Sequence, residues 1–153
     1  LRNPVDRAYS NYNLGVRGGS EHLSFEESIK KEIFLLEQNN DIQSDGIEKY
    51  TRPRSYISKG LYYNQIKKWF ELFSKEQILV INTENLLENP EQTLEKVFKF
   101  LELSNEKIKN IKNRKRVNYQ PMNANTRKYL IDFFKPHNEK LYRIIEKRFE
   151  WDK

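Results

Sequence analysis

The sequence predicts an α/β fold in which most of this 153-residue chain is helical, and two observations support that prediction. The apolar run at 77–82, Gln-Ile-Leu-Val-Ile-Asn, lacks the alternation of a half-exposed strand. We therefore expect a strand there that is covered on both faces, as in a parallel sheet. Around it, apolar residues recur every three or four positions in several stretches, which predicts amphipathic helices. Leu1 is expected to add the end of a second strand.

The opening stretch predicts a capped helix that begins beside an anion site. Asn3 can cap the helix, and Pro4 can take the first helical position, where its missing N–H costs nothing. Arg2 precedes the turn, and Ser10 lies two turns into the helix. A guanidinium and a hydroxyl that converge near a helix start offer charge and hydrogen-bond donors to an anion. The alternative is an ordinary capped surface helix.

A glycine-rich stretch follows at 15–22, with three glycines in five residues, and predicts a flexible loop. His22 in this loop is expected to be solvated, and catalysis is the less favoured interpretation. Ser24 and Glu27 then form a capping box for a helix that we expect to end near Gln38.

Residues 39–55 are polar and predict a long surface loop. Arg52 and Arg54 in this loop could meet an anionic acceptor, although plain exposure is the favoured interpretation. The helix expected after Gly60 has an apolar stripe typical of a core helix, formed by Tyr62, Ile66, Trp69, Phe70 and Phe73.

Two further helical regions follow the predicted strand. Asn89-Pro90 suits the N-cap and first position of a helix whose apolar face extends to Leu101. The last region, at about 123–149, keeps one apolar face. Pro136 removes a hydrogen bond inside it, so we expect two helices or a kink. His137 beside it is expected to be structural rather than a catalytic base.

The opening pattern, Arg2-x-Pro4-x-x-Arg7-Ala8-x-Ser10-x-Tyr12, resembles the 3′-phosphate-binding segment of sulfotransferases. These enzymes use 3′-phosphoadenosine 5′-phosphosulfate (PAPS) as their donor. The chain looks like the bacterial sulfotransferase-domain proteins, which in turn resemble the sulfotransferase domains of heparan sulfate N- and 3-O-sulfotransferases. Later segments carry the same resemblance: Gly60-x-Tyr62 with Ile66 and Trp69, Glu84-x-Leu86 with Asn89-Pro90, and Phe134-x-Pro136-His137-Asn138.

The resemblance implies a three-layer fold like that of the P-loop kinases, and it implies roles for particular residues. Arg2 and Ser10 would grip the 3′-phosphate of PAPS, or of the product 3′-phosphoadenosine 5′-phosphate (PAP). Tyr62 or Tyr63 would lie against the adenine or line the acceptor cleft. A basic run within 107–116 is similar to the loop that folds over the nucleotide, although a solvated charge run is the usual explanation. The candidate nucleotide contacts in this run are Arg114, Lys115 and Arg116.

The resemblance covers residues 1–153 but implies only the carboxyl-terminal portion of a single sulfotransferase domain. No Gly-x-x-x-x-Gly-Lys-[Ser/Thr] loop occurs, and no looser phosphate-binding loop with a preceding lysine is visible. We therefore expect the 5′-phosphosulfate loop and the catalytic residues upstream of Leu1. The family's chemistry requires no metal, and no ligand set with convincing spacing is present.

Composition is consistent with these expectations. The formal net charge of +6 favours an anionic partner: a nucleotide, a sulfated or acidic glycan, or nucleic acid, the last as a weaker RNA-binding alternative. No RNA-recognition signature accompanies the basic residues, and no run is apolar enough to cross a membrane, so neither nucleic acid nor a membrane is expected as a partner. The absence of cysteine is compatible with the bacterial cytoplasm, where we expect this protein.

The predicted function is PAPS-dependent sulfuryl transfer to a hydroxyl or amine of a carbohydrate or small metabolite. The alternative is a non-catalytic nucleotide- or polyanion-binding module.

Overall fold

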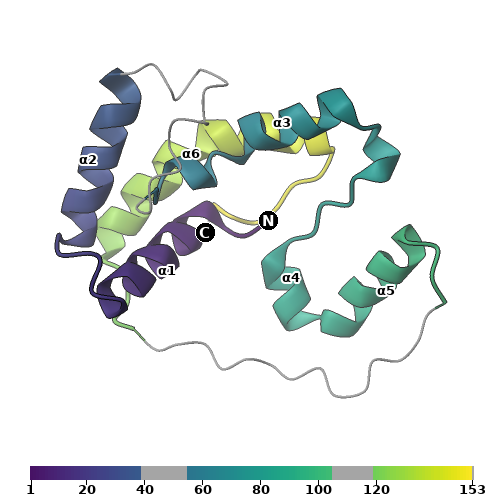
Figure 1. The fold of residues 1–153 in the computed structure, drawn as a ribbon, viewed down its shortest axis with the longest axis horizontal. Helices are drawn as coiled ribbons and strands as arrows, with labels where there is room; N and C mark the ends of the chain where they lie inside the picture. Colours follow the sequence, from purple (N-terminus) through teal and green to yellow (C-terminus); the bar gives the residue numbers. More distant parts are fainter. Residues whose placement is uncertain (39–54, 105–118, 153) are drawn as a thin grey trace.

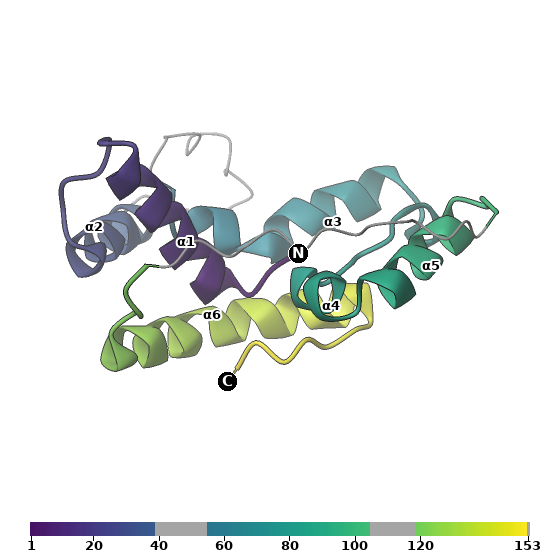
Figure 2. The same ribbon diagram turned by 90° about the horizontal axis from the view of Figure 1, so that it is seen from below.

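The computed structural model describes residues 1–38, 55–104 and 119–152, and within these ranges the chain is mostly helical, as predicted. The elements are α1 (Pro4–Arg17), α2 (Phe25–Gln38), η2 (Ser58–Gly60), α3 (Tyr62–Leu72), η3 (Lys75–Gln77), α4 (Thr83–Glu88), α5 (Pro90–Phe100) and α6 (Ala124–Ile145). Figure 1 shows that α6 is the longest element and that α1 and α3 lie along it, whereas α4 and α5 form a separate pair. Figure 2 shows α1 and α3 on the same side of α6.

The predicted strand at 77–82 is absent from the described residues. Gln77 ends a short 3-10 helix, and the residues after it are extended but belong to no strand. They are also not covered on both faces, because Leu79 is 37% exposed. A ladder needs a neighbouring strand, and among the described residues only Leu1 pairs with this segment. The Leu1 amino group donates to the Ile81 carbonyl at 2.5 Å, and the Thr83 amide donates to the Leu1 carbonyl at 2.6 Å. These two bonds follow the pattern of a parallel pair, but the parallel sheet itself stays a prediction.

The cap predicted at the start of α1 is confirmed. The Asn3 Oδ1 atom accepts from the amides of Val5 and Asp6, and Pro4 occupies the first helical position. The glycine-rich loop begins later than predicted, because α1 continues through Gly15 to Arg17. Gly18 then ends the helix by donating its amide to the Leu14 carbonyl at 3.0 Å. This extension keeps Arg17 on the helix.

The capping box at the start of α2 is also confirmed. The Ser24 hydroxyl oxygen accepts from the Glu27 amide at 3.3 Å, and the Glu27 carboxylate accepts from the Ser24 amide at 2.9 Å. The described part of α2 runs from Phe25 to Gln38, and the predicted end of the helix near Gln38 borders residues outside the described ranges, so it stays a prediction.

Two buried apolar clusters meet along α6. The first joins α1, α2 and the amino-terminal half of α6, through Val5, Ala8, Phe25, Ile29, Ile33, Leu36, Tyr56, Ile57, Leu61, Leu130 and Phe134. The second joins α3 to the carboxyl-terminal half of α6, through Tyr62, Leu141, Tyr142, Phe149 and Trp151. Pro136 lies between these clusters, yet α6 is one continuous helix, so the two-helix alternative was wrong. Pro136 is exposed, and packing on either side of it holds the helix together.

The apolar stripes of α3 and α5 are less buried than predicted. Tyr62 is 8% exposed, but Trp69 is 56% and Phe73 43% exposed, with their rings stacked at 5.7 Å. On α5 only Thr93 is buried, and Leu101 after the helix is 53% exposed. The reason is that only the first part of α3 lies in the second apolar cluster, while α5 packs chiefly against the short α4.

Candidate anion-binding site

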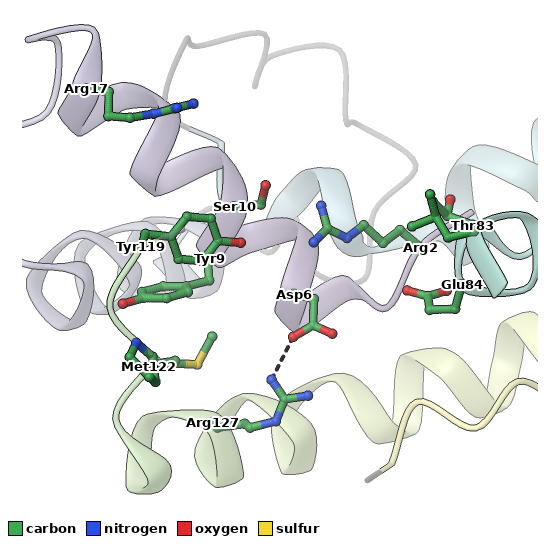
Figure 3. Close-up of a pocket in the computed structure, with 12 residues that line it drawn as sticks. Arg2, Asp6, Tyr9, Ser10, Arg17, Thr83, Glu84, Tyr119, Met122 and Arg127 are labelled. Carbon is green, nitrogen blue, oxygen red and sulfur yellow. Dashed lines mark hydrogen bonds and ion pairs between the residues drawn. The ribbon is translucent and has the colours of Figure 1, made fainter. Parts of the chain in front are cut away.

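A cavity of about 640 Å³ lies against one face of α1 (Figure 3). Its walls come from the start of the chain and α1, from the start of α4, and from the segment that leads into α6. The lining residues are Arg2, Asp6, Tyr9, Ser10, Arg17, Thr83, Glu84, Leu87, Tyr119, Pro121, Met122 and Arg127. The spacing of Asp6, Ser10 and Arg17 places them on one helical face. The structure therefore brings Arg2 and Ser10 to the same cavity.

The donor groups of Arg2 and Ser10 are both available to a ligand. Each side chain is half-buried. Figure 3 shows the Arg2 guanidinium pointing toward α1, in the direction of Ser10. Within residues 1–38, 55–104 and 119–152, no side chain bonds or forms an ion pair with this guanidinium. An arginine that is partly withdrawn from water and has no carboxylate partner is a strong donor to an external anion.

The charges that line the cavity are partly neutralised. Arg127 Nη1 donates to Asp6 Oδ1 at 2.6 Å. Glu84 Oε1 accepts from the Asn3 amide at 2.9 Å. Arg17 has no ion-pair partner in the described part of the chain. With Asp6 and Arg127 cancelling each other, the remaining lining charges are those of Arg2, Arg17 and Glu84, so the balance is positive.

Two tyrosines form the wall opposite Arg2. The Tyr9 and Tyr119 rings meet edge to face, with their centroids 5.4 Å apart. The Tyr9 hydroxyl donates to the Gln120 carbonyl at 2.8 Å, which ties α1 to the segment before α6. Tyr119 and Met122 follow the basic run within 107–116 by three and six residues, and both line the cavity. Arg114, Lys115 and Arg116 lie outside the described residues, as do Arg52 and Arg54.

Tyr62 and Tyr63 do not line this cavity. The Tyr62 hydroxyl donates to the Arg2 carbonyl at 3.0 Å, and its ring lies 5.9 Å from that of Trp151. Burial raises the pKa of the Tyr62 hydroxyl. Tyr63 is partly buried and packs against the second apolar cluster. Tyr62 therefore contacts the backbone of Arg2 and does not face the cavity that the Arg2 side chain lines.

The two histidines lie away from the cavity. His137 is on α6, with its ring centroid 5.6 Å from that of Phe133. Burial lowers the pKa of His137 below its usual value, and nearby Lys140 adds to this effect. His22 is exposed after α1.

Sequence reasoning missed several residues that line the cavity. Arg17 could have been found from its position seven residues after Ser10, which is two helical turns away on the same face. No local sequence pattern indicates that Thr83 and Glu84 line the cavity, because α4 meets the start of the chain through tertiary packing. The same holds for Arg127 at the start of α6.

The described residues contain no group of three or more His, Cys, Asp or Glu side chains placed to hold a metal ion. The expectation that the chemistry requires no metal stays a prediction. In the same ranges, no helix has the length and apolar character needed to cross a membrane.

Comparison with known proteins identifies relatives along the whole chain. Residues 1–143 match the family model of the sulfotransferase domain. Membrane-associated sulfotransferase kil1 of Dictyostelium discoideum is 36% identical over 95 residues, which are 62% of this chain and 20% of that protein. Human carbohydrate sulfotransferase 15 is 27% identical over 170 aligned residues, covering 99% of this chain and 30% of that protein. Mouse bifunctional heparan sulfate N-deacetylase/N-sulfotransferase 3 is 24% identical, covering 96% of this chain and 19% of that protein.

A solved structure shares the fold. The sulfotransferase from Alicyclobacillus acidocaldarius superposes with a TM-score of 0.79 at 31% identity, covering 100% of this chain and 56% of that chain. The resemblance to sulfotransferases inferred from the sequence motifs is thereby confirmed. The chain spans less than a third of the length of these three curated relatives and about half of the solved structure.

Proposed function

Because this chain belongs to the sulfotransferase domain family, we propose that it forms part of an enzyme that transfers a sulfuryl group from PAPS to an acceptor. The acceptor would be a hydroxyl or amine of a carbohydrate or small metabolite. The names of the human and mouse relatives, which refer to carbohydrate and heparan sulfate, support a sugar acceptor. The cytoplasmic location expected from the sequence stays a prediction.

The 3′-phosphate of PAPS, or of the product PAP, would bind in the cavity on α1. The observation that carries this proposal is that Arg2 and Ser10 line one cavity while no described carboxylate neutralises Arg2. The guanidinium can donate two parallel hydrogen bonds to phosphate oxygens, and the hydroxyl can add a third. Tyr62, Tyr63, Arg114, Lys115 and Arg116 remain the other predicted nucleotide contacts.

Sulfuryl transfer also requires groups that act at the reacting sulfur. The donor and the acceptor must be held in line, the charge on the leaving 5′-phosphate must be neutralised, and a base must take the acceptor's proton. We assign none of these tasks to a residue of this chain. Its proposed contribution is to bind and orient the 3′-phosphate end of the donor.

The second candidate is a nucleotide- or polyanion-binding module without turnover. The basic residues within 107–116, together with Arg2 and Ser10, favour it. Transfer of labelled sulfate from PAPS by the full-length gene product would support the enzyme. Selective PAP binding without transfer to any acceptor tested would support the module.

Calorimetric titration tests the proposed 3′-phosphate site. PAP is compared with adenosine 5′-phosphate, which lacks the 3′-phosphate, on wild type and Arg2→Ala. We expect PAP to bind more tightly to the wild type and to lose about 100-fold in affinity with Arg2→Ala, as for the loss of two hydrogen bonds to a charged group. Arg143→Ala removes an equal charge from the far end of α6 and serves as the matched control. Equal binding of the two nucleotides to the wild type would contradict the assignment.

A further inference from the structure

The backbone that carries Arg2 is held at successive polar groups by residues from other elements. The Leu1 carbonyl accepts two hydrogen bonds from Thr83, one from its amide at 2.6 Å and one from its Oγ1 atom at 2.7 Å. The Arg2 carbonyl accepts from the Tyr62 hydroxyl at 3.0 Å. The Asn3 amide donates to Glu84 Oε1 at 2.9 Å. Arg2 is therefore bonded on both sides of its Cα atom before its side chain contacts any ligand.

These bonds come from the first two residues of α4 and the first residue of α3. Asn82 caps α4 by accepting the Glu84 amide at 3.2 Å, which holds the backbone of Glu84. Burial of Tyr62 against Trp151 keeps its hydroxyl in place under Arg2. Two of the three contacting residues, Glu84 and Tyr62, are therefore themselves held by other parts of the fold.

Glu84 is an unexpected residue in a cavity for an anion. It lines the same cavity as Arg2, and its Oε2 atom is buried without a hydrogen-bond partner in the described part of the chain. A negative charge there opposes binding of phosphate. The carboxylate's contact with the Asn3 amide gives it a different task, because that amide precedes the first turn of α1 and follows Arg2 directly. The acceptor oxygen of Glu84 holds the Asn3 amide, whereas its negative charge weakens phosphate binding.

We propose that Thr83 and Glu84 are positioning residues for Arg2, which fix its backbone so that the guanidinium meets the 3′-phosphate of the donor in one orientation. This inference rests on the proposed function. A bidentate contact between a guanidinium and a phosphate depends on the angle of approach, so a backbone shift weakens it more than it weakens a simple charge attraction. The effect should therefore fall on the 3′-phosphate and not on the remainder of the nucleotide.

The experiment compares Glu84→Ala with Glu84→Gln in the full-length gene product, with Kd for PAP and for adenosine 5′-phosphate as the readouts. Glu84→Gln keeps an acceptor oxygen and removes the charge. Glu84→Ala removes both. We expect Glu84→Ala to weaken PAP binding about 10-fold, as for loss of one well-placed hydrogen bond, and to leave adenosine 5′-phosphate unchanged. Glu84→Gln should bind PAP at least as tightly as the wild type.

A double-mutant cycle separates positioning from general destabilisation. In an Arg2→Ala background, Glu84→Ala should change the Kd for PAP less than about 2-fold, because the group that it orients is gone. Thr83→Val and Thr83→Ser provide a second pair, in which only Ser keeps the hydroxyl that bonds the Leu1 carbonyl. If Glu84→Ala does not fold, the Thr83 pair carries the test.

Three results would overturn the inference while leaving the proposed function in place. They are a wild-type Kd for PAP in Glu84→Ala and Thr83→Val, equal weakening of PAP and adenosine 5′-phosphate, and an undiminished effect in the Arg2→Ala background. Tighter PAP binding by both Glu84→Ala and Glu84→Gln would show that the charge alone matters, and would also overturn it. Failure of the wild type to prefer PAP over adenosine 5′-phosphate would instead overturn the proposed function, and this inference with it.

Discussion

Asp6 and Arg127 form an ion pair across the cavity wall, with Arg127 Nη1 donating to Asp6 Oδ1 at 2.6 Å (Figure 3). The pair joins the first turn of α1 to the first turn of α6. Both side chains are about one third exposed, so the pair contributes little to stability, of the order of 1 kcal/mol or less. Its larger consequence is electrostatic, because Asp6 neutralises an arginine that lines the cavity.

Asp6→Asn should therefore tighten PAP binding while slightly destabilising the protein. Removing the negative charge of Asp6 makes the cavity more positive by one unit, and we expect a gain of about 2- to 5-fold in affinity at low salt that falls away as salt screens the charge. Calorimetry at about 20 mM and about 500 mM salt measures the change in PAP affinity. These concentrations lie below and above the ~0.1 M at which the screening length is about 10 Å. Glu139→Gln removes an equal charge from the surface pair with Arg148 and is the control. Weaker PAP binding by Asp6→Asn would mean that the pair shapes the site instead.

Arg17→Ala should have a much smaller effect on PAP binding than Arg2→Ala. Ser10 and Arg17 are seven residues apart on α1, which is about 10 Å along the helix axis. A phosphate held by Ser10 is then about one screening length from Arg17, so we expect a loss of about 2- to 3-fold at low salt and none at high salt. The Arg2→Ala loss should persist at high salt, because direct hydrogen bonds are lost. Equal, salt-resistant losses for both variants would place a bound group at the Arg17 end of the cavity.

The features that sequence predicted correctly are those encoded within a few residues. The cap at Asn3 and the capping box of Ser24 and Glu27 each involve atoms two or three positions apart, so side-chain chemistry alone indicates them. Arg2 and Ser10 could be paired because Arg2 directly precedes the N-cap of α1 and Ser10 lies about two turns into the same helix. These local signals indicated where α1 and α2 begin and that Arg2 and Ser10 would lie near each other.

The features that sequence did not predict depend on distant partners. The segment at 77–82 has the composition of a buried strand, but a strand forms only where a neighbour supplies the ladder. In the part of the chain that the structure describes, that neighbour is the single residue Leu1. Glu84 meets Asn3 across 81 positions of sequence, a contact that no local pattern indicates. The apolar stripe of α3 likewise predicted a core helix. Burial of its carboxyl-terminal half depends on whether another element packs against it, and Trp69 in that half is exposed.

Glu32→Ala should be among the most destabilising single substitutions in this chain. The buried Glu32 carboxylate accepts the amides of Tyr56 at 2.7 Å and of Ile57 and Ser58 at 2.9 Å, and it also accepts the Ser58 hydroxyl at 2.9 Å. Without it, three buried amides lose their acceptor, each costing about 1–3 kcal/mol. We expect a loss of about 3 kcal/mol or more in the free energy of unfolding, measured by urea denaturation. Glu37→Ala, at an exposed position of α2, is the control and should change stability by less than about 0.5 kcal/mol.

Gly60→Ala should destabilise the crossing of η2 with α1 and α6. A Cβ atom on Gly60 would lie 3.0 Å from Phe134 Cε1 and Cζ and 3.1 Å from Pro4 Cβ, inside normal contact distance. Phe134 is fully buried, so its ring has little room to move, and the overpacking should cost about 1–3 kcal/mol. Thermal unfolding of Gly60→Ala and of the double variant Gly60→Ala/Phe134→Leu measures it. The smaller Leu side chain should reduce the penalty of the added methyl group, and an unreduced penalty would place the strain elsewhere.

His137 should make the stability of the protein depend on pH. Burial against Phe133, with a smaller effect from Lys140, lowers the pKa of His137 in the folded state below the value of about 6.5 that it has when unfolded. Between these two values the unfolded state binds the proton more readily, so acid favours unfolding. The contribution of His137 is fully present above about pH 6.5 and is lost progressively as the pH falls toward the folded-state pKa.

His137→Gln should remove this dependence. Urea denaturation from about pH 5 to pH 8 should show the stability of the wild type falling more steeply with acid than that of His137→Gln, over the window below the unfolded-state pKa. His22→Gln removes the exposed histidine and should retain the wild-type slope. A slope that is unchanged in His137→Gln, or that is lost in His22→Gln, would show that the proton is bound elsewhere. Because His137 lies on α6 away from the cavity, PAP affinity should be the same in His137→Gln and wild type at pH 8.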